Sequence, residues 1–217
     1  MNLPRRTVLF VLITALTIGT IASATAEELP RVLLIGDSIS IGYHAATVAA
    51  LKGKADVQRP KTNCGPTTRG LQNLDAWLGD GRWDAIHFNW GLHDLKYINE
   101  QGGRDINGKQ QVPPAEYEKN LRELVKRLQR TGATLIFATT TPTPKGAGGR
   151  VPGDSAVYNK IAIKVMKEND LAIDDLYSFA LPRLNEIQRP ADVHFTREGS
   201  EILAGQVAES ILKALEK

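Results

Sequence analysis

A serine that follows a buried strand is the residue of this chain best placed to act as a nucleophile. The four aliphatic residues 32–35 predict a strand buried on both faces, and Gly36 ends it. Asp37 and Ser38 come next, and the residues after them predict a helix start. Open α/β sheets bind ligands at the carboxyl ends of their strands, where helix-terminal amides also stabilise negative charge. Ser38 is therefore a candidate nucleophile, although a serine here can instead cap the helix.

Strand-like runs alternate with helical patterns along the chain. The predicted strands are 32–35, 55–59, 83–90, 134–141 and 171–176, and the predicted helices are 41–52, 71–78, 117–128, 156–169 and one that begins near Thr196. This alternation predicts a parallel sheet with helices on both faces, which is a three-layer α/β/α sandwich. No internal repeat or linker interrupts the pattern, so we expect one domain.

Two segments do not fit the alternation. Residues 97–114 are polar and contain Asn107-Gly108, which is a short hairpin signal, and residues 142–153 are rich in Gly and Pro. Both follow the carboxyl ends of predicted strands, where functional loops collect. We therefore expect both segments to form loops near the site.

The first 26 residues predict a secretory signal peptide. Arg5 and Arg6 precede an apolar run, and small residues at 22–26 fit a cleavage site. The run is short for a membrane span, so an uncleaved anchor is the lesser alternative. We expect residues 27–217 to form the domain, and the protein to be exported to the periplasm or the cell exterior without stable membrane insertion after cleavage.

Charge and cysteine content exclude some classes of partner. Of 27 basic residues, Arg5 and Arg6 lie in the predicted signal, and none of the 24 acidic residues does, so the remaining chain is close to neutral. This balance does not favour binding to nucleic acid. Cys64 is the only cysteine, so no internal disulfide is possible. No cluster with metal-ligand spacing occurs, and we expect neither a metal nor another cofactor.

Four short segments resemble the blocks of the SGNH hydrolases, also called GDSL hydrolases. They are Gly36-Asp37-Ser38-Ile39, Asn63-Cys64-Gly65, Gly91-Leu92-His93-Asp94 and Asp192-Val193-His194-Phe195-Thr196, in the family's order. The third resembles a block usually written Gly-x-Asn-Asp. The resemblance spans nearly all of the chain after the predicted signal. It implies the flavodoxin-like fold of that family and hydrolysis of carboxylic esters.

The resemblance also implies roles for single residues. Ser38 would attack the ester carbonyl, and His194 would be the base that a serine hydroxyl needs. The backbone N–H groups of Ser38 and Gly65 would stabilise the oxyanion of the tetrahedral intermediate. Asp37 and Asp94 would support the turns of their blocks.

Two departures from the family pattern leave alternatives open. His93 replaces the usual asparagine donor of the oxyanion hole; an imidazole N–H can donate to an oxyanion, but the ring can also pack or bond elsewhere. We also expect a histidine to make activity more dependent on pH than an amide does. The family usually has an aspartate three residues before the histidine, but Ala191 stands there and Asp192 follows it. Either Asp192 orients His194, or a backbone carbonyl does and the site is a Ser–His dyad.

The sequence thus predicts an exported serine hydrolase. Polar, glycine-rich loops favour short acyl groups, such as acetyl, on a carbohydrate or another polar carrier, so the partner would be a small-molecule or glycan ester. A lysophospholipase or thioesterase is the alternative within the family. A domain that has lost catalysis and binds glycans is the alternative from another class. The oligomeric state stays open.

Overall fold

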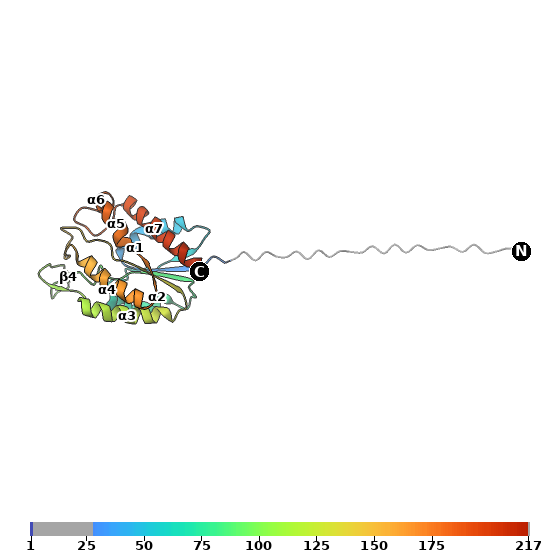
Figure 1. Ribbon diagram of the computed structural model, residues 1–217, viewed down its shortest axis with the longest axis horizontal. Coiled ribbons are helices and arrows are strands. Elements are labelled where there is room, and N and C mark those ends of the chain that lie inside the picture. The colour runs from blue at the N-terminus through green and yellow to red at the C-terminus, as the bar shows by residue number, and fades with distance from the viewer. Residues whose placement is uncertain (2–27, 217) are drawn as a thin grey trace.

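The computed structural model describes Met1 and residues 28–216, and the predicted signal peptide therefore lies almost wholly outside the described residues (Figure 1). Five parallel strands form the main sheet in the order β2-β1-β3-β6-β7. Their bounds are Arg31–Ile35 for β1, Asp56–Gln58 for β2, Ala85–Phe88 for β3, Thr134–Ala138 for β6 and Ala172–Asp174 for β7. The predicted three-layer α/β/α sandwich with a parallel sheet is confirmed.

The strand order places the site. β1 and β3 lie side by side at the centre of the strand order. The chain leads from β1 to β2 on one side and from β3 to β6 on the other. Ligands bind at such a switch point, outside the carboxyl ends of the strands. The loops after β1, β2 and β3 carry the first three blocks, and all three loops leave the same edge of the sheet.

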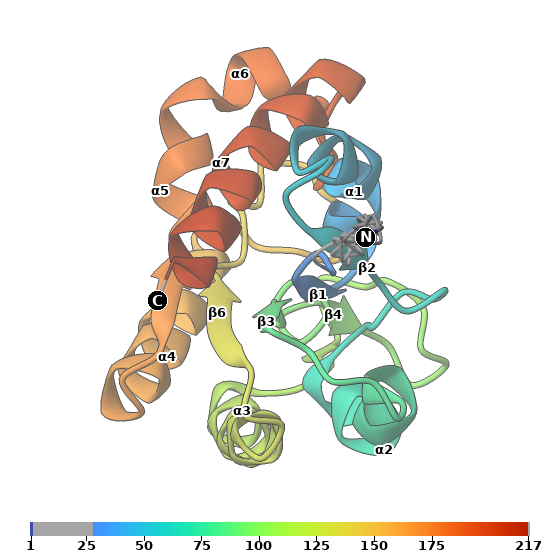
Figure 2. The ribbon, with the colours of Figure 1, turned by 90° about the vertical axis from the view of Figure 1, so that its right-hand side faces the viewer.

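Helices cover the sheet in two layers (Figure 2). One layer contains α1 (Ser38–Ala50) and α7 (Arg197–Leu215), and the other contains α2 (Thr67–Leu78), α3 (Pro114–Gln129) and α4 (Asp154–Glu168). The apolar stripe of α3 is buried as predicted, from Tyr117 to Leu128. The predicted stripe of α7, at Leu203, Val207 and Ile211, is buried too. Burial of these stripes against the sheet holds the loops above it in place.

Two helices begin earlier than predicted because side chains cap their first turns. α1 begins at Ser38 instead of 41, since the Asp37 carboxylate accepts a hydrogen bond from the Ile39 N–H at 2.9 Å. α2 begins at Thr67 instead of 71, and Asp94 accepts from the Thr67 N–H at 2.8 Å. The second cap comes from a distant loop, so the local pattern around residue 67 contains no sign of it.

The polar segment after β3 forms a small antiparallel ribbon of β4 (Tyr97–Ile98) and β5 (Lys109–Gln110). The sequence signal at Asn107-Gly108 predicts a tight hairpin, and the structure differs: the connection runs over residues 99–108, and Gly108 closes a turn onto Asp105. Short helical elements between β7 and α7 were also not predicted. They are α5 (Leu176–Ala180), a 3-10 turn (Leu181–Arg183) and α6 (Leu184–Ile187).

Within the described residues, no helix combines the length and apolar character needed to cross a membrane.

Candidate active site

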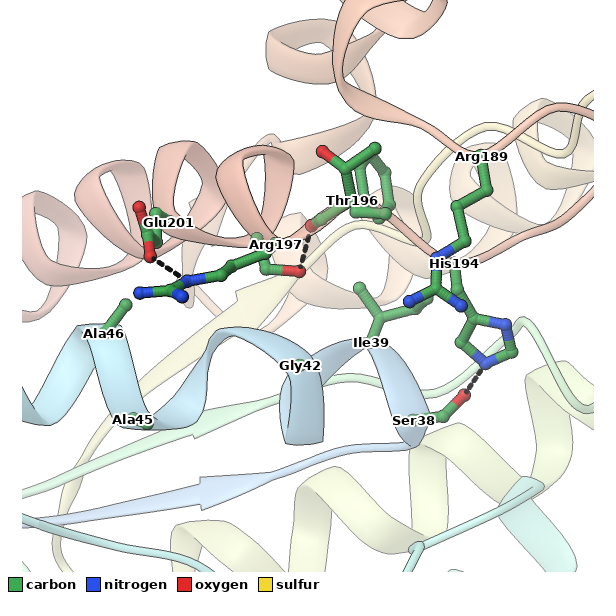
Figure 3. A pocket seen from close by; sticks show the side chains of 12 residues that line it. Ser38, Ile39, Gly42, Ala45, Ala46, Arg189, His194, Thr196, Arg197 and Glu201 are labelled. Carbon is green, nitrogen blue, oxygen red and sulfur yellow. Dashed lines mark hydrogen bonds and ion pairs between the residues drawn. The ribbon is translucent and has the colours of Figure 1, made fainter.

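Ser38, His194 and Asp192 form a hydrogen-bonded chain at the switch point, and Figure 3 shows the bond between Ser38 and His194. The Ser38 Oγ lies 2.9 Å from the His194 Nε2, and the His194 Nδ1 lies 2.7 Å from the Asp192 Oδ1. Ser38 begins α1, whereas the other two residues lie in the loop before α7. The geometry is that of a catalytic triad, in which the carboxylate fixes the tautomer of the base. It favours the triad over the dyad that the sequence left open.

The backbone at Ala191 brings Asp192 to the histidine from only two residues away. Ala191 has a φ of 54°, in the left-handed region that residues with a side chain rarely adopt. Around it the Arg189 N–H donates to the His194 carbonyl at 3.0 Å, and the Asp192 N–H donates to the Arg189 carbonyl at 3.2 Å. Such strain persists where the surrounding structure holds it. This tight turn allows the Asp192 carboxylate to reach the ring.

Hydrogen bonds stabilise the ionised form of Asp192. Its Oδ1 accepts from both the backbone N–H of His194, at 3.2 Å, and the ring. Partial burial raises the pKa of Asp192, but the hydrogen bonds from His194 outweigh burial and hold its pKa below the usual range. The carboxylate is therefore charged at neutral pH and can orient His194.

Asp37 braces the nucleophile turn, as predicted for a supporting residue. It is 3% exposed, and besides its bond to Ile39 its backbone carbonyl accepts from the Ser40 hydroxyl at 2.8 Å. Burial raises the pKa of the Asp37 carboxyl. Because α1 begins at Ser38, the Ser38 N–H belongs to the helix-start amides that lack an intrahelical acceptor. It is thus available as an oxyanion donor.

The loop after β2 lies against the nucleophile turn. The Cys64 N–H donates to the Gly36 carbonyl at 3.2 Å, which ties this loop to the end of β1. Gly65 has a φ of +60°, which favours glycine, and its N–H donates to the Asn63 Oδ1 at 2.9 Å. An oxyanion would therefore compete with the Asn63 side chain for this donor. The Cys64 side chain is buried, and burial raises the pKa of its thiol to about 11, so it is not an activated nucleophile.

His93 is half-buried in the loop after β3, and no described group hydrogen-bonds its ring. Burial lowers the pKa of His93 to about 4, and nearby positive charges add to the effect. These charges belong to Lys96, Arg150, Arg104 and Arg69. The ring is thus neutral at pH 5 and above, where it keeps one N–H donor. Our expectation that His93 makes activity sensitive to pH near neutrality does not agree with this lowered pKa.

We predict that His93→Ala lowers kcat by about 10²–10³-fold, the usual cost of losing one oxyanion donor. His93→Asn restores an N–H donor and should recover most of the rate. Because the pKa of His93 is about 4, both wild type and His93→Asn should have the same pH profile between pH 5 and 9. Steady-state hydrolysis of p-nitrophenyl acetate gives kcat and its pH profile for wild type, His93→Ala and His93→Asn. A wild-type rate in His93→Ala would refute the donor role.

Asp94 supports the third block from the protein interior. Its Oδ1 accepts from both the N–H and the hydroxyl of Thr67, at 2.8 and 2.5 Å, and the Asn120 side chain bonds to the same hydroxyl. Its Oδ2 is buried without a hydrogen-bond partner in the described residues. Burial raises the pKa of Asp94 to about 7, against the hydrogen bonds from Thr67, which lower it. This carboxyl therefore joins β3 to the start of α2.

The raised pKa of Asp94 predicts a pH-dependent stability. In the folded protein Asp94 keeps its proton up to pH about 7, whereas an unfolded aspartate loses it near pH 4. The folded state binds more protons in this window, so the free energy of unfolding falls as pH rises from 4 to 7. A shift of about three pKa units corresponds to at most ~4 kcal/mol.

We therefore predict that Asp94→Asn removes part of this pH dependence. Denaturant unfolding at pH 5 and pH 8 gives the change in the free energy of unfolding between the two pH values, for wild type and for the variant. The exposed Asp80 offers a matched control, since Asp80→Asn removes a carboxylate that has no described partner. If Asp94→Asn loses as much stability between pH 5 and pH 8 as wild type does, the prediction is wrong.

A groove of about 480 Å³ leads away from Ser38 and His194 between α1 and the start of α7 (Figure 3). Small residues of α1 line one side: Gly42, Ala45 and Ala46. The opposite side and the mouth are polar: Arg189, Thr196, Arg197, Ser200 and Glu201. A Cβ at Gly42 would lie 3.2 Å from the Ser200 Oγ, so glycine keeps this part of the groove open.

Sequence reasoning did not identify the groove or Arg189, which lines the groove together with His194 (Figure 3). No local signal marks these residues, because they come together only when α1 packs on α7. Among the described residues, no group of three or more His, Cys, Asp or Glu side chains is placed to hold a metal ion.

Comparisons with known proteins agree with the predicted family. Residues 34–202 match the GDSL-like lipase/acylhydrolase family. A GDSL esterase/lipase of Arabidopsis thaliana is 27% identical over 145 residues, which cover 62% of this chain and 57% of that protein. This chain thus spans little more than half the length of the curated relative it matches.

Solved structures share the fold. A lipase/acylhydrolase from Enterococcus faecalis superposes with a TM-score of 0.70 at 19% identity, covering 84% of this chain and 95% of that one. Axe2, an acetylxylan esterase from Geobacillus stearothermophilus, gives a TM-score of 0.67 at 17% identity and covers 87% and 94%. The family match includes Ser38 and His194, and this chain belongs to the GDSL-like lipase/acylhydrolase family.

Proposed function

We propose that this protein is a serine esterase that removes short acyl groups, most simply acetyl, from a carbohydrate or another polar carrier. The observation that carries the proposal is the chain of hydrogen bonds from Ser38 through His194 to Asp192, at 2.9 and 2.7 Å. A domain that only binds glycans has no need for this arrangement. Family membership supports ester hydrolysis, and the named acetylxylan esterase offers one precedent on the same fold.

The mechanism follows from the hydrogen bond between the Ser38 Oγ and the His194 Nε2. His194 takes the proton from the Ser38 hydroxyl as the oxygen attacks the ester carbonyl, and Asp192 stabilises the imidazolium that forms. The N–H groups of Ser38, Gly65 and His93 hold the negative charge on the former carbonyl oxygen. His194 then gives the proton to the leaving alcohol, and water repeats the sequence on the acyl-enzyme.

The position of the groove supports an ester substrate whose alcohol part is polar. The leaving oxygen must lie within hydrogen-bond distance of the His194 Nε2, so the alcohol occupies the His194 side of Ser38. The groove between α1 and α7 opens from that side and carries hydroxyl, carboxylate and guanidinium groups. A second cavity, beside Asp37 and Leu92, has only about 10 Å³ and cannot accept a long acyl chain. Together these features favour a small acyl group on a polyhydroxy carrier.

A series of p-nitrophenyl esters tests the activity. We expect Ser38-dependent hydrolysis that is fastest for acetate and declines with chain length, and no hydrolysis by Ser38→Ala. Faster release from long acyl esters would indicate a lysophospholipase or thioesterase type instead. If neither these esters nor acetylated oligosaccharides are cleaved, labelling of Ser38 by a fluorophosphonate distinguishes an enzyme with a strict substrate from a domain that only binds.

We also propose that the protein is exported and that its first 26 residues are removed. The basic, apolar and small-residue segments in residues 1–26 support this. N-terminal sequencing of the protein recovered from the medium or periplasm of expressing cells tests it. A start near residue 27 is expected, and an intact Met1 in the cytoplasmic fraction would overturn the proposal.

A further inference from the structure

Positively charged side chains surround the catalytic turn, and they come from five different segments. They are Arg69 in the first turn of α2, Lys96 before β4, Arg104 between β4 and β5, Arg150 before α4, and Arg189 before α7. We call these five the cationic rim. The segments that carry them follow β2, β3, β6 and β7, all at the carboxyl edge of the sheet.

Arg150 is the most buried member of the cationic rim, at 7% exposed. Its Nε and Nη2 donate to the Leu92 carbonyl at 3.3 and 3.2 Å, and its Nη1 donates to the Gly148 carbonyl at 3.2 Å. Leu92 precedes His93, so this guanidinium is anchored directly beneath the predicted oxyanion donor. Carbonyl groups satisfy hydrogen bonds but carry no net charge. Burial and the charge of Arg104 lower the pKa of Arg150 to about 10, although the charges of Asp37 and Asp192 act to raise it.

Arg69 and Arg104 pack closely against glycines of the loops at the site. A Cβ on Gly65 would lie 3.1 Å from the Arg69 Cδ, so the Arg69 stem covers this part of the oxyanion loop. A Cβ on Gly149 would lie 3.2 Å from the Arg104 Cβ, which places Arg104 against the loop that carries Arg150.

The same loop also reaches the triad. A Cβ on Gly146 would lie 3.0 Å from the Ala191 Cβ, next to Asp192. The Gly-rich segment 146–150 therefore links Arg104 and Arg150 to the turn that holds Asp192 and Arg189.

Among the described residues, the cationic rim forms no ion pair. Three arginines elsewhere form ion pairs: Arg122 with Glu118 at 2.6 Å, Arg127 with Asp75 at 2.7 Å and Arg197 with Glu201 at 3.1 Å. The other described arginines outside the rim form none, and what distinguishes the rim is that its members gather at one edge of the sheet, around the site. In the described part of the chain, no carboxylate lies within 4.0 Å of a rim nitrogen.

The carboxylates of the site are bonded to other groups. Asp37 accepts from Ile39, Asp94 from Thr67 and Asp192 from His194. The rim cations also act on one another: burial lowers the pKa of Lys96, and the charges of Arg150 and Arg104 lower it further. A cluster of like charges at the mouth of a site raises the local concentration of oppositely charged ligands.

We infer that the natural substrate carries an anionic group close to its ester, and that its chemical class is an O-acylated sugar bearing a carboxylate or a sulfate. Guanidinium groups bind both anions through paired N–H donors. Arg150 uses three of its five N–H donors on the carbonyls of Leu92 and Gly148. The inference rests on the proposed esterase function and adds the charge of its substrate.

Matched acetyl esters test the inference. We would compare kcat/KM for O-acetylated methyl glucoside, methyl glucuronide and methyl glucoside 6-sulfate at low salt and in 0.5 M NaCl, a high-salt condition in which charges are screened over about 4 Å. At least one anionic ester should be hydrolysed about tenfold or more efficiently than the neutral one at low salt. The advantage should fall in high salt. The ratio between the two anionic esters identifies which anion is preferred.

Charge-neutralising variants then locate the effect. The double variant Arg104→Gln/Arg189→Gln, in which Arg189 lines the groove that receives the alcohol, should reduce the ratio of anionic to neutral kcat/KM by about tenfold. Lys54→Gln removes an exposed charge from the turn between α1 and β2, at the opposite edge of the sheet, and should leave the ratio unchanged. A ratio of one or less in wild type, or a ratio that the double variant retains, would overturn the inference. If none of the three esters is cleaved, p-nitrophenyl acetate is not hydrolysed and a fluorophosphonate does not label Ser38, the proposed function itself is refuted.

Discussion

His194→Ala is expected to lower kcat by about four to six orders of magnitude, the loss usually seen when a serine hydrolase loses its base. The Ser38 hydroxyl bonds only to the His194 Nε2 in the described structure, at 2.9 Å. Without the ring, the hydroxyl has no acceptor for its proton and the leaving alcohol has no donor. Single-turnover hydrolysis of p-nitrophenyl acetate, with wild type beside the variant, measures the loss.

Combining His194→Ala with Ser38→Ala tests whether the two residues act together. Residues that act as one unit have losses that do not add, so Ser38→Ala/His194→Ala should be no slower than either single variant. Additive losses would mean that the two residues act independently, which contradicts the hydrogen-bond geometry. Unchanged circular dichroism should accompany all three variants, because both side chains are only partly buried at the edge of the sheet.

Asp192→Asn is expected to lower kcat by about 10²–10⁴-fold, less than His194→Ala does. The carboxylate accepts from the His194 Nδ1 at 2.7 Å, which places the free ring nitrogen toward Ser38. An amide can present its NH₂ group to the Nδ1 and favour the wrong tautomer. The two side chains are 37% and 39% exposed, so water can replace part of the lost stabilisation, and the loss should fall below that of a fully buried triad.

Asp192→Ala separates the two possible causes of the loss. An alanine leaves Nδ1 to water and cannot impose the wrong tautomer, so it should retain more activity than asparagine does. If Asp192→Asn keeps wild-type kcat, the site works as a Ser–His dyad. If its loss equals that of His194→Ala, the carboxylate contributes more than this exposed geometry allows.

The fold was largely predictable because its signals are local. β1 and β6 appear in the sequence as apolar runs, and α3 and α7 show their buried faces at helical spacing from Tyr117 to Leu128 and from Leu203 to Ile211. Alternation of the two patterns then favours parallel strands with helical crossovers. The start of α2 was missed because its cap, Asp94, lies 27 residues away in the chain. The connection between β4 and β5 was missed because the Asn107-Gly108 turn closes within it and does not join the two strands.

The sequence by itself determined the class of fold and the family, and it singled out Ser38 and His194 as candidate catalytic residues, since each depends on residue types in short, ordered blocks. Only the tertiary structure decided that Asp192 reaches His194, because that contact depends on the left-handed backbone of Ala191. It likewise decided that Asn63 engages the Gly65 N–H. The groove and the cationic rim bring together segments up to about 160 residues apart in the chain. This arrangement follows from strand order and loop dihedral angles, which local patterns do not encode.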